Sequence, residues 1–89
     1  MTKEKADLLA AAFGKRFTAH VETEEISPGR FRFNIFSKHY GDITHFDRQD
    51  QAWEVVDRIL VTREEADDIS SILTIGPEDV DASLVELMP

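Results

Sequence analysis

The stretch FTAHVETEEISPGRFRFNI, residues 17–35, decides the fold of this chain. From Phe17 to Glu24, apolar or small side chains alternate with polar ones, and this period of two is typical of a strand buried on one face. Ser27-Pro28-Gly29 has the composition of a turn. Alternation then resumes from Phe31 to Ile35, with aromatic and aliphatic residues at every second position. The stretch is therefore predicted to form a β-hairpin.

Charged residues face one another across this predicted hairpin. Arg30 and Arg32 of the second strand fall on the same polar face as His20, Glu22 and Glu24 of the first. Pairs of opposite charge on neighbouring strands stabilise a sheet by roughly 0.2–1 kcal/mol each. We expect such pairs here, and the alternative is an anion-binding site formed by the two arginines.

The residues before the hairpin predict a helix. Four apolar residues between positions 8 and 13 recur at helical spacing. Gly14 follows, and glycine is the residue type that best tolerates the positive φ found after many helix ends. A first helix is therefore predicted from Lys3 to Phe13.

The clearest helical pattern follows the hairpin and runs from Asp47 to Leu60. Asp47 is expected to cap this helix, with Phe46 packed just before the cap. Arg48 and the other charged residues of the stretch are expected to stay in water. The apolar stripe comprises Ala52, Trp53, Val56, Ile59 and Leu60.

The remaining segments are assigned from local signals. Residues 37–46 show no periodicity and are expected to form the longest loop. Thr62 to Glu65 has the form of a capping box, which predicts a short helical turn to about Asp67. Ile69 to Ile75 fits either a strand or a helix, but its β-branched residues and the Gly76-Pro77 stop favour a strand. A last helix is predicted from Pro77 to Leu87.

Together these elements predict a single α+β domain over residues 1–89. Their order is α-β-β-α-α-β plus a C-terminal helix. A two-stranded hairpin alone is marginally stable, so the third strand is expected to join it in a three-stranded sheet with helices packed on one face. Phe36 points to the opposite face and needs another cover, either the C-terminal helix or a partner.

The charge of the chain is unevenly distributed. Its formal net charge is −8, from 10 Lys and Arg against 18 Asp and Glu. Up to Trp53 the two signs balance, and from Glu54 onward the acidic residues face only Arg58 and Arg63. A phosphate backbone would be repelled by that second half, which disfavours general nucleic-acid binding. The composition is that of a globular protein, expected to be cytoplasmic and without a membrane span.

No catalytic constellation is present in the sequence. Ser70 and Ser71 have no His or Lys close by in sequence, so a serine nucleophile is not expected. The chain has no cysteine, which excludes disulfides and thiolate metal sites. His39 and His45 share a loop and can approach one metal ion, although water-facing loop histidines are the simpler interpretation. We expect no enzymatic activity and no cofactor.

One stretch of the sequence resembles the BolA family of small α/β regulators. It begins at Phe36-Ser37, continues through Tyr40-Gly41, and enters a helix at Phe46-Asp47-Arg48. Later, residues 72–79 are similar to the third strand of that family and its Thr-Pro-Glu-Glu ending. Gly41 lies one position early for the family pattern. The resemblance covers roughly residues 3–79 and implies the fold order given above.

The same resemblance implies a regulator that acts through protein contacts. Members of the BolA family can share a [2Fe–2S] cluster with a monothiol glutaredoxin, using a His at the start of the third strand. This chain has Asp67-Asp68-Ile69 at that place. The resemblance therefore suggests a monothiol glutaredoxin as partner. Only His39 and His45 could replace the missing cluster ligand, and neither is at the family position.

We expect a non-enzymatic adaptor with an exposed apolar patch at Phe36 or on the last helix. The alternative is a nucleic-acid-binding regulator, since the architecture is related to KH-like folds; it would need a positive patch at Arg30, Arg32, Lys38 and Arg48. Homodimerisation through a sheet edge or the last helix stays open. The candidate interaction surface comprises Arg30, Arg32, Phe36, Lys38, His39, Tyr40, His45 and Arg48.

Overall fold

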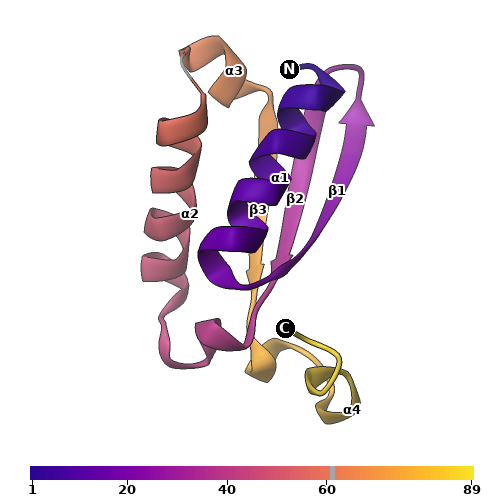
Figure 1. Cartoon of the computed structure of the whole chain (residues 1–89), viewed down its shortest axis with the longest axis vertical. Helices are drawn as coiled ribbons and strands as arrows, with labels where there is room; N and C mark the ends of the chain where they lie inside the picture. Colours follow the sequence, from indigo (N-terminus) through magenta and orange to yellow (C-terminus); the bar gives the residue numbers. More distant parts are fainter. Residues whose placement is uncertain (61) are drawn as a thin grey trace.

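Three strands form one mixed sheet, in the spatial order β1-β2-β3. The computed structural model describes residues 1–60 and 62–89 (Figure 1). Its elements are α1 (Lys3–Phe17), β1 (His20–Ser27), β2 (Arg30–Phe36), the 3₁₀ helix η1 (Lys38–Asp42), α2 (His45–Ile59), α3 (Arg63–Asp67), β3 (Ile69–Ile75), the 3₁₀ helix η2 (Pro77–Asp79) and α4 (Ala82–Val85). The α+β fold, the three-stranded sheet and the order α-β-β-α-α-β predicted from the sequence are confirmed.

The predicted hairpin is present, and β2 is the central strand. β1 pairs antiparallel with β2 around the Pro28-Gly29 turn, where Gly29 adopts a φ of +76°. β3 pairs parallel with the other side of β2, so residues 69–75 are a strand. The expected cross-strand charge pair forms between Arg32 and Glu24. Arg30 instead lies opposite Ser27 in the register, away from Glu22.

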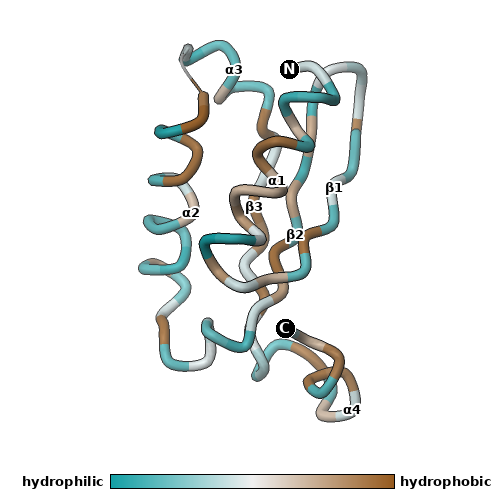
Figure 2. The backbone as a smooth tube through the Cα atoms, in the orientation of Figure 1, coloured by the Kyte–Doolittle hydropathy of each residue, from teal (hydrophilic) through white to brown (hydrophobic). Residues whose placement is uncertain are grey.

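The core lies between the sheet and a layer of two helices. α1 contacts β1, β2 and α2, while α2 also contacts β3. The rings of Phe13 on α1 and Phe33 on β2 meet edge to face, with centroids 5.6 Å apart, which fixes the face of the sheet that the helices cover. Figure 2 shows the hydrophobic residues of α2 concentrated toward its C-terminal end. Val55 and Val56 of that part belong to this core. We call this side the helical face and the opposite side the outer face.

The first helix is one turn longer than the sequence predicts. It passes through Gly14 and ends at Phe17, and Thr18 adopts a left-handed φ of 48°. Phe13 and Phe17 are both buried one turn apart, which favours continuation of the helix. Ala19 then turns back so closely that its N–H donates to the Gly14 carbonyl at 3.0 Å, and a Cβ at position 14 would lie 3.3 Å from the Ala19 oxygen. The glycine therefore permits this close approach and does not end the helix.

The start of α2 also differs from the prediction. Thr44 caps the helix, since its Oγ1 accepts a hydrogen bond from the Asp47 N–H at 3.2 Å. The expectation that Asp47 is the cap is therefore wrong, and Phe46 lies in the first turn, 74% exposed. The expectation that Arg48 stays in water is wrong as well, because its side chain is buried.

Most of the predicted apolar stripe of α2 reaches the core. Ala52, Val56 and Leu60 are buried, and Trp53 and Ile59 are partly buried against the same core. Val55 is buried too, which the sequence pattern missed.

Two further segments differ from expectation. The predicted loop over residues 37–46 contains η1, which is anchored by a hydrogen bond from the Ser37 hydroxyl to the Phe17 carbonyl at 2.7 Å. The predicted last helix is divided into η2 and α4, because the acidic residues of η2 are held by contacts outside the segment, as described below. The predicted cap at Thr62 is present. Within the described ranges, no helix combines the length and apolar character needed to cross a bilayer.

Candidate functional site

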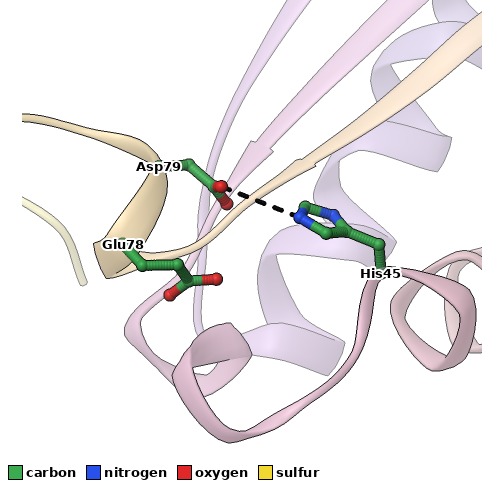
Figure 3. A group of neighbouring side chains, drawn as sticks. All are labelled: His45, Glu78 and Asp79. Atoms are coloured by element: carbon green, nitrogen blue, oxygen red, sulfur yellow. Dashed lines mark ion pairs between the residues drawn. The ribbon is translucent and has the colours of Figure 1, made fainter.

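Three charged side chains meet where the start of α2 faces η2. A nitrogen of His45 and a carboxylate oxygen each of Glu78 and Asp79 lie within 4.8 Å of one another. Figure 3 shows the imidazole directed toward the carboxylate of Asp79, and the distance from Nε2 to Oδ1 is 3.7 Å. A histidine with two carboxylates is a donor set that divalent cations accept, so a metal interpretation has to be weighed first.

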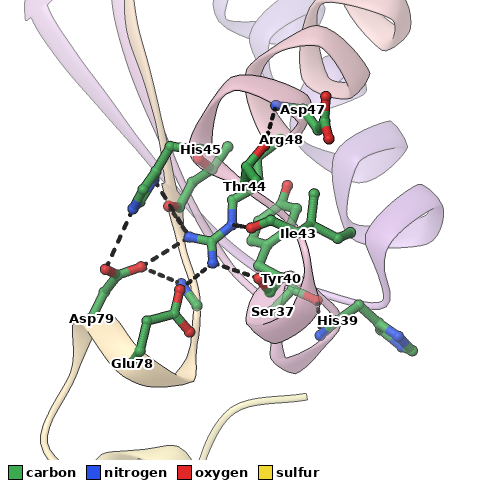
Figure 4. A network of polar contacts seen from close by, with 12 residues as sticks. Ser37, His39, Tyr40, Ile43, Thr44, His45, Asp47, Arg48, Glu78 and Asp79 are labelled. Carbon is green, nitrogen blue, oxygen red and sulfur yellow. Dashed lines mark hydrogen bonds and ion pairs between the residues drawn. The ribbon is translucent and has the colours of Figure 1, made fainter.

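The guanidinium of Arg48 lies beside this group and binds both carboxylates (Figure 4). Nη1 donates to Oδ2 of Asp79 at 3.0 Å, and Nη2 donates to Oε1 of Glu78. A metal ion at this position would be repelled by the guanidinium and would compete with it for the same oxygens. The predicted second histidine, His39, points away from the group in Figure 4. The group is therefore better explained as an ion-pair cluster than as a metal centre.

Arg48 also satisfies backbone groups that are far from one another in the sequence. Nε donates to the carbonyl of Ile43 at 2.8 Å, Nη2 to that of Tyr40, and Nη1 reaches that of Thr74 at 3.4 Å. Only 1% of Arg48 is exposed, and its guanidinium also lies 5.3 Å from the centre of the Tyr40 ring. One side chain thus joins η1, the start of α2 and the end of β3 to η2.

The protonation of these groups follows from the same contacts. Burial lowers the pKa of Arg48, but its hydrogen bonds to Glu78 and Asp79 and their negative charges outweigh that effect and raise it overall. The hydrogen bond from Arg48 is the largest cause of the lowered pKa of Glu78. For Asp79, the hydrogen bond from the Gly76 N–H is the largest cause of its lowered pKa, followed by Arg48. All three groups are therefore charged at neutral pH.

We refer to Arg48, Glu78 and Asp79 as the Arg48 clamp, and to residues 80–89 as the C-terminal segment. The clamp fixes η2, from which the C-terminal segment leaves the sheet. A Cβ at position 76 would lie 2.8 Å from Nη2 of Arg48, so only glycine lets the chain pass this close to the guanidinium. The far end of the segment is tied down by a hydrogen bond from the Lys38 N–H to the Pro89 carbonyl at 3.3 Å.

The C-terminal segment and the outer face of the sheet enclose an apolar groove, which we call the Phe36 groove. Its volume is about 210 Å³. Leu84 and Leu87 at its rim are 47% and 79% exposed, whereas Met88 is buried. The prediction that Phe36 faces away from the helices is confirmed, because Phe36 lines this groove and its ring lies 5.9 Å from that of His20 on β1. The groove is lined by His20, Glu22, Phe36, Val80, Leu84, Leu87 and Met88.

The outer face continues from the groove along β2 and β3. Leu73 on this face is 45% exposed and lies beside Asn34 in the register. Asn34 is only 8% exposed, and its side-chain oxygen Oδ1 has no hydrogen-bond partner among the described residues. Glu22 and Glu24 border this surface on β1.

The eight residues of the predicted interaction surface do not form one surface. Tyr40, His45 and Arg48 come together, but Tyr40 and Arg48 are buried. Tyr40 packs against Phe17 in the core, and burial raises the pKa of its hydroxyl, which has no partner within the described part of the chain.

The side chains of the other five do not join that cluster. Phe36 lines the groove, and Lys38 and His39 are exposed on η1. Arg30 and Arg32 lie toward the opposite end of β2, and Arg32 is paired with Glu24. At about 3.3 Å per residue, Arg30 is roughly 20 Å from the end of β2 that carries Phe36.

The sequence analysis missed the acidic partners of Arg48. It also missed the burial of the Asn34 side-chain oxygen, which has no hydrogen-bond partner among the described residues. Glu78 and Asp79 were assigned to the opening of a helix, and nothing local to them indicates a buried arginine 30 residues away. A signal for Arg48 itself was present: Arg48 precedes Ala52 by four residues and Val55 by seven, which places it on the buried side of the helix.

The residues present do not fit a [2Fe–2S] cluster ligand of the BolA type. β3 begins with Ile69, after Asp67 and Asp68, and the sequence has no cysteine. The three histidines lie on β1, η1 and α2.

No protein-family model, curated protein or solved structure matches this chain significantly. Its function therefore has to be inferred from the geometry of the site.

Proposed function

We propose that this chain is a small, non-enzymatic, cytoplasmic adaptor that binds a protein partner in the Phe36 groove. The observation that carries the proposal is the open apolar groove with the exposed side chains of Leu84 and Leu87 at its rim. Exposed Leu84 and Leu87 beside half-buried Phe36 form a cluster of the kind that marks protein-binding surfaces. A partner lying on the outer face would cover these side chains.

The charges around the groove indicate what the partner looks like. Glu22 lines it on β1, and Asp81 and Glu86 are exposed on the C-terminal segment. A partner with apolar anchors flanked by Lys or Arg is complementary to this rim. The partner suggested by the resemblance to BolA-like proteins is a monothiol glutaredoxin. Binding would rest on surface contacts, since this chain lacks the cluster ligand.

The alternative function, nucleic-acid binding, receives less support from the positions of its four cations. Arg48 is buried against Glu78 and Asp79, and Arg32 is paired with Glu24. Arg30 and Lys38 remain, near opposite ends of β2. A phosphate backbone would find no continuous positive surface among these four residues.

A titration followed by two-dimensional NMR tests the proposal. Cluster-free monothiol glutaredoxin is expected to shift the amide signals of His20, Glu22, Phe36 and the C-terminal segment. Replacing both Leu84 and Leu87 by Glu should weaken binding by about tenfold or more, because anchor residues dominate interface energetics.

Leu8→Glu is the matched control. Leu8 is also an exposed leucine, 54% exposed, but it lies on α1, and this variant should bind as the unaltered chain does. Shifts produced by a single-stranded oligonucleotide and not by glutaredoxin would favour the nucleic-acid function instead. Shifts confined to other surfaces would overturn the assignment of the groove.

A further inference from the structure

A second groove lies between α1 and α2, on the side of the sheet opposite to the Phe36 groove. We call it the helix groove, and its volume is about 410 Å³. Since its lining belongs entirely to the helical layer, it shares no residue with the site proposed above. The helix groove is lined by Ala12, Lys15, Arg16, Val55, Arg58 and Ile59.

The floor of the helix groove is apolar and its walls are positive. Val55 is buried, and Ala12 and Ile59 are partly buried against the core, so the floor continues the hydrophobic core to the surface. Lys15 and Arg16 of α1 line one side of the groove, and Arg58 of α2 lines the other. The groove therefore offers contact to a ligand that is apolar along its centre and negative along its edges.

The three cations form no ion pair within the described part of the chain, although the chain carries 18 acidic residues against 10 basic ones. The guanidinium of Arg16 lies over the Phe17 ring, 5.1 Å from its centre. Each of the three cations stands in the last turn of its helix, where it complements the helix dipole. The helix dipole favours cations near the C-terminal end of each helix. It does not explain why the cations of two different helices line the same apolar groove.

We propose that the helix groove binds an amphipathic helix of a partner protein, one with an apolar stripe flanked by Asp and Glu. A helix laid between two packed helices inserts its anchors into the apolar floor and places its acidic flanks on the cations. None of the six lining residues is aromatic, so the groove lacks the stacking surfaces that single-stranded nucleic acid uses. The proposal adds a second docking surface, of opposite charge, and does not rest on binding at the Phe36 groove.

The test uses a designed peptide and its charge-reversed twin. The first peptide carries Leu at positions i, i+3, i+4 and i+7, with Glu at the flanking positions; the second carries Lys in place of every Glu. Each is about 18 residues long, because shorter isolated helices are marginal in water. The Glu peptide is expected to bind and to shift the amide signals of Ala12, Lys15, Val55 and Ile59, whereas the Lys peptide should not bind.

Charge reversal in the protein provides the matched control. The triple variant Lys15→Glu, Arg16→Glu, Arg58→Glu is expected to weaken binding of the Glu peptide by about tenfold or more. The triple variant Lys3→Glu, Arg30→Glu, Arg63→Glu changes the net charge equally at other exposed cations and should weaken binding much less. Thermal unfolding of both variants verifies that they fold.

Three results would overturn the proposal. The first is equal binding of the two peptides or an equal loss in both triple variants, which would mean that only general electrostatics is measured. The second is the absence of binding or of shifts at α1 and α2. The third is a shift of the amide signals at the helix groove that depends on the concentration of the protein alone. If the double variant Asp81→Lys, Glu86→Lys removes this shift, the occupant of the groove is the C-terminal segment of a second copy.

Discussion

Replacing Arg48 by methionine is expected to lower the free energy of unfolding by about 3–5 kcal/mol. Methionine fills part of the same volume, but it leaves the Ile43 carbonyl without the Arg48 donor and Asp79 without its cation. The Tyr40 carbonyl loses one of its two donors and keeps the Ile43 N–H. Glu78 contributes less to this loss, since its side chain is 49% exposed. Urea denaturation at neutral pH, followed by the fluorescence of Trp53, the single tryptophan of the chain, measures the change.

Arg58→Met is the control for this prediction, because Arg58 is an exposed arginine of the same helix. Its effect on the free energy of unfolding should stay within about 0.5 kcal/mol, as is usual for surface positions.

The contribution of the Arg48 clamp to stability depends on pH, because the pKa values of Glu78 and Asp79 are lowered in the folded state. This contribution is fully present above the ordinary pKa values of the two groups, about 4. It is lost as the pH falls through their pKa values in the folded state. The difference in the free energy of unfolding between the Arg48→Met variant and the unaltered chain should therefore become smaller at acidic pH. Equal losses of unfolding free energy in Arg48→Met and Arg58→Met would contradict the structural role assigned to Arg48.

Replacing Phe33 by alanine is expected to cost about 3–5 kcal/mol of stability. Phe33 is fully buried on the central strand, opposite Thr23 of β1 and Ile72 of β3, and its ring contacts Phe13 of α1. The substitution leaves a cavity at the point where sheet and helices meet. Thermal and chemical denaturation of the variant measure the loss.

Phe46→Ala removes the same side chain from an exposed position. Because Phe46 is 74% exposed in the first turn of α2, its replacement should change stability by less than about 0.5 kcal/mol. Comparable losses at both positions would mean that the helices do not cover the sheet on the side of Phe33.

The sheet could be predicted from the sequence because its signal is local. A period of two places Phe31, Phe33 and Ile35 on one face, and a register shift by one residue would expose all of them. The same alternation assigned Phe36 to the outer face. The end of α1 could not be predicted in this way, since Gly14 is compatible both with a helix end and with the close contact to Ala19 that the fold contains.

The candidate site could be predicted only in part, because it depends on partners distant in sequence. Arg48 lies on the buried side of its helix, but a charge there is explained only by Glu78 and Asp79, which a separate strand brings to it. Those contacts also divide the predicted last helix at residue 79. The Phe36 groove follows from that division and therefore could not be anticipated from the C-terminal sequence.

The most direct test asks whether the Arg48 clamp holds the C-terminal segment against Phe36. Nuclear Overhauser effects between the Phe36 ring and the side chains of Val80, Leu84 and Met88 report on this contact. They should be present in the unaltered chain and weaken or vanish in the double variant Glu78→Gln, Asp79→Asn, whereas effects between Phe13 and Phe33 should persist in both. Their absence from the unaltered chain, or equal intensities in the variant, would contradict the assembly of the groove on which the adaptor proposal depends.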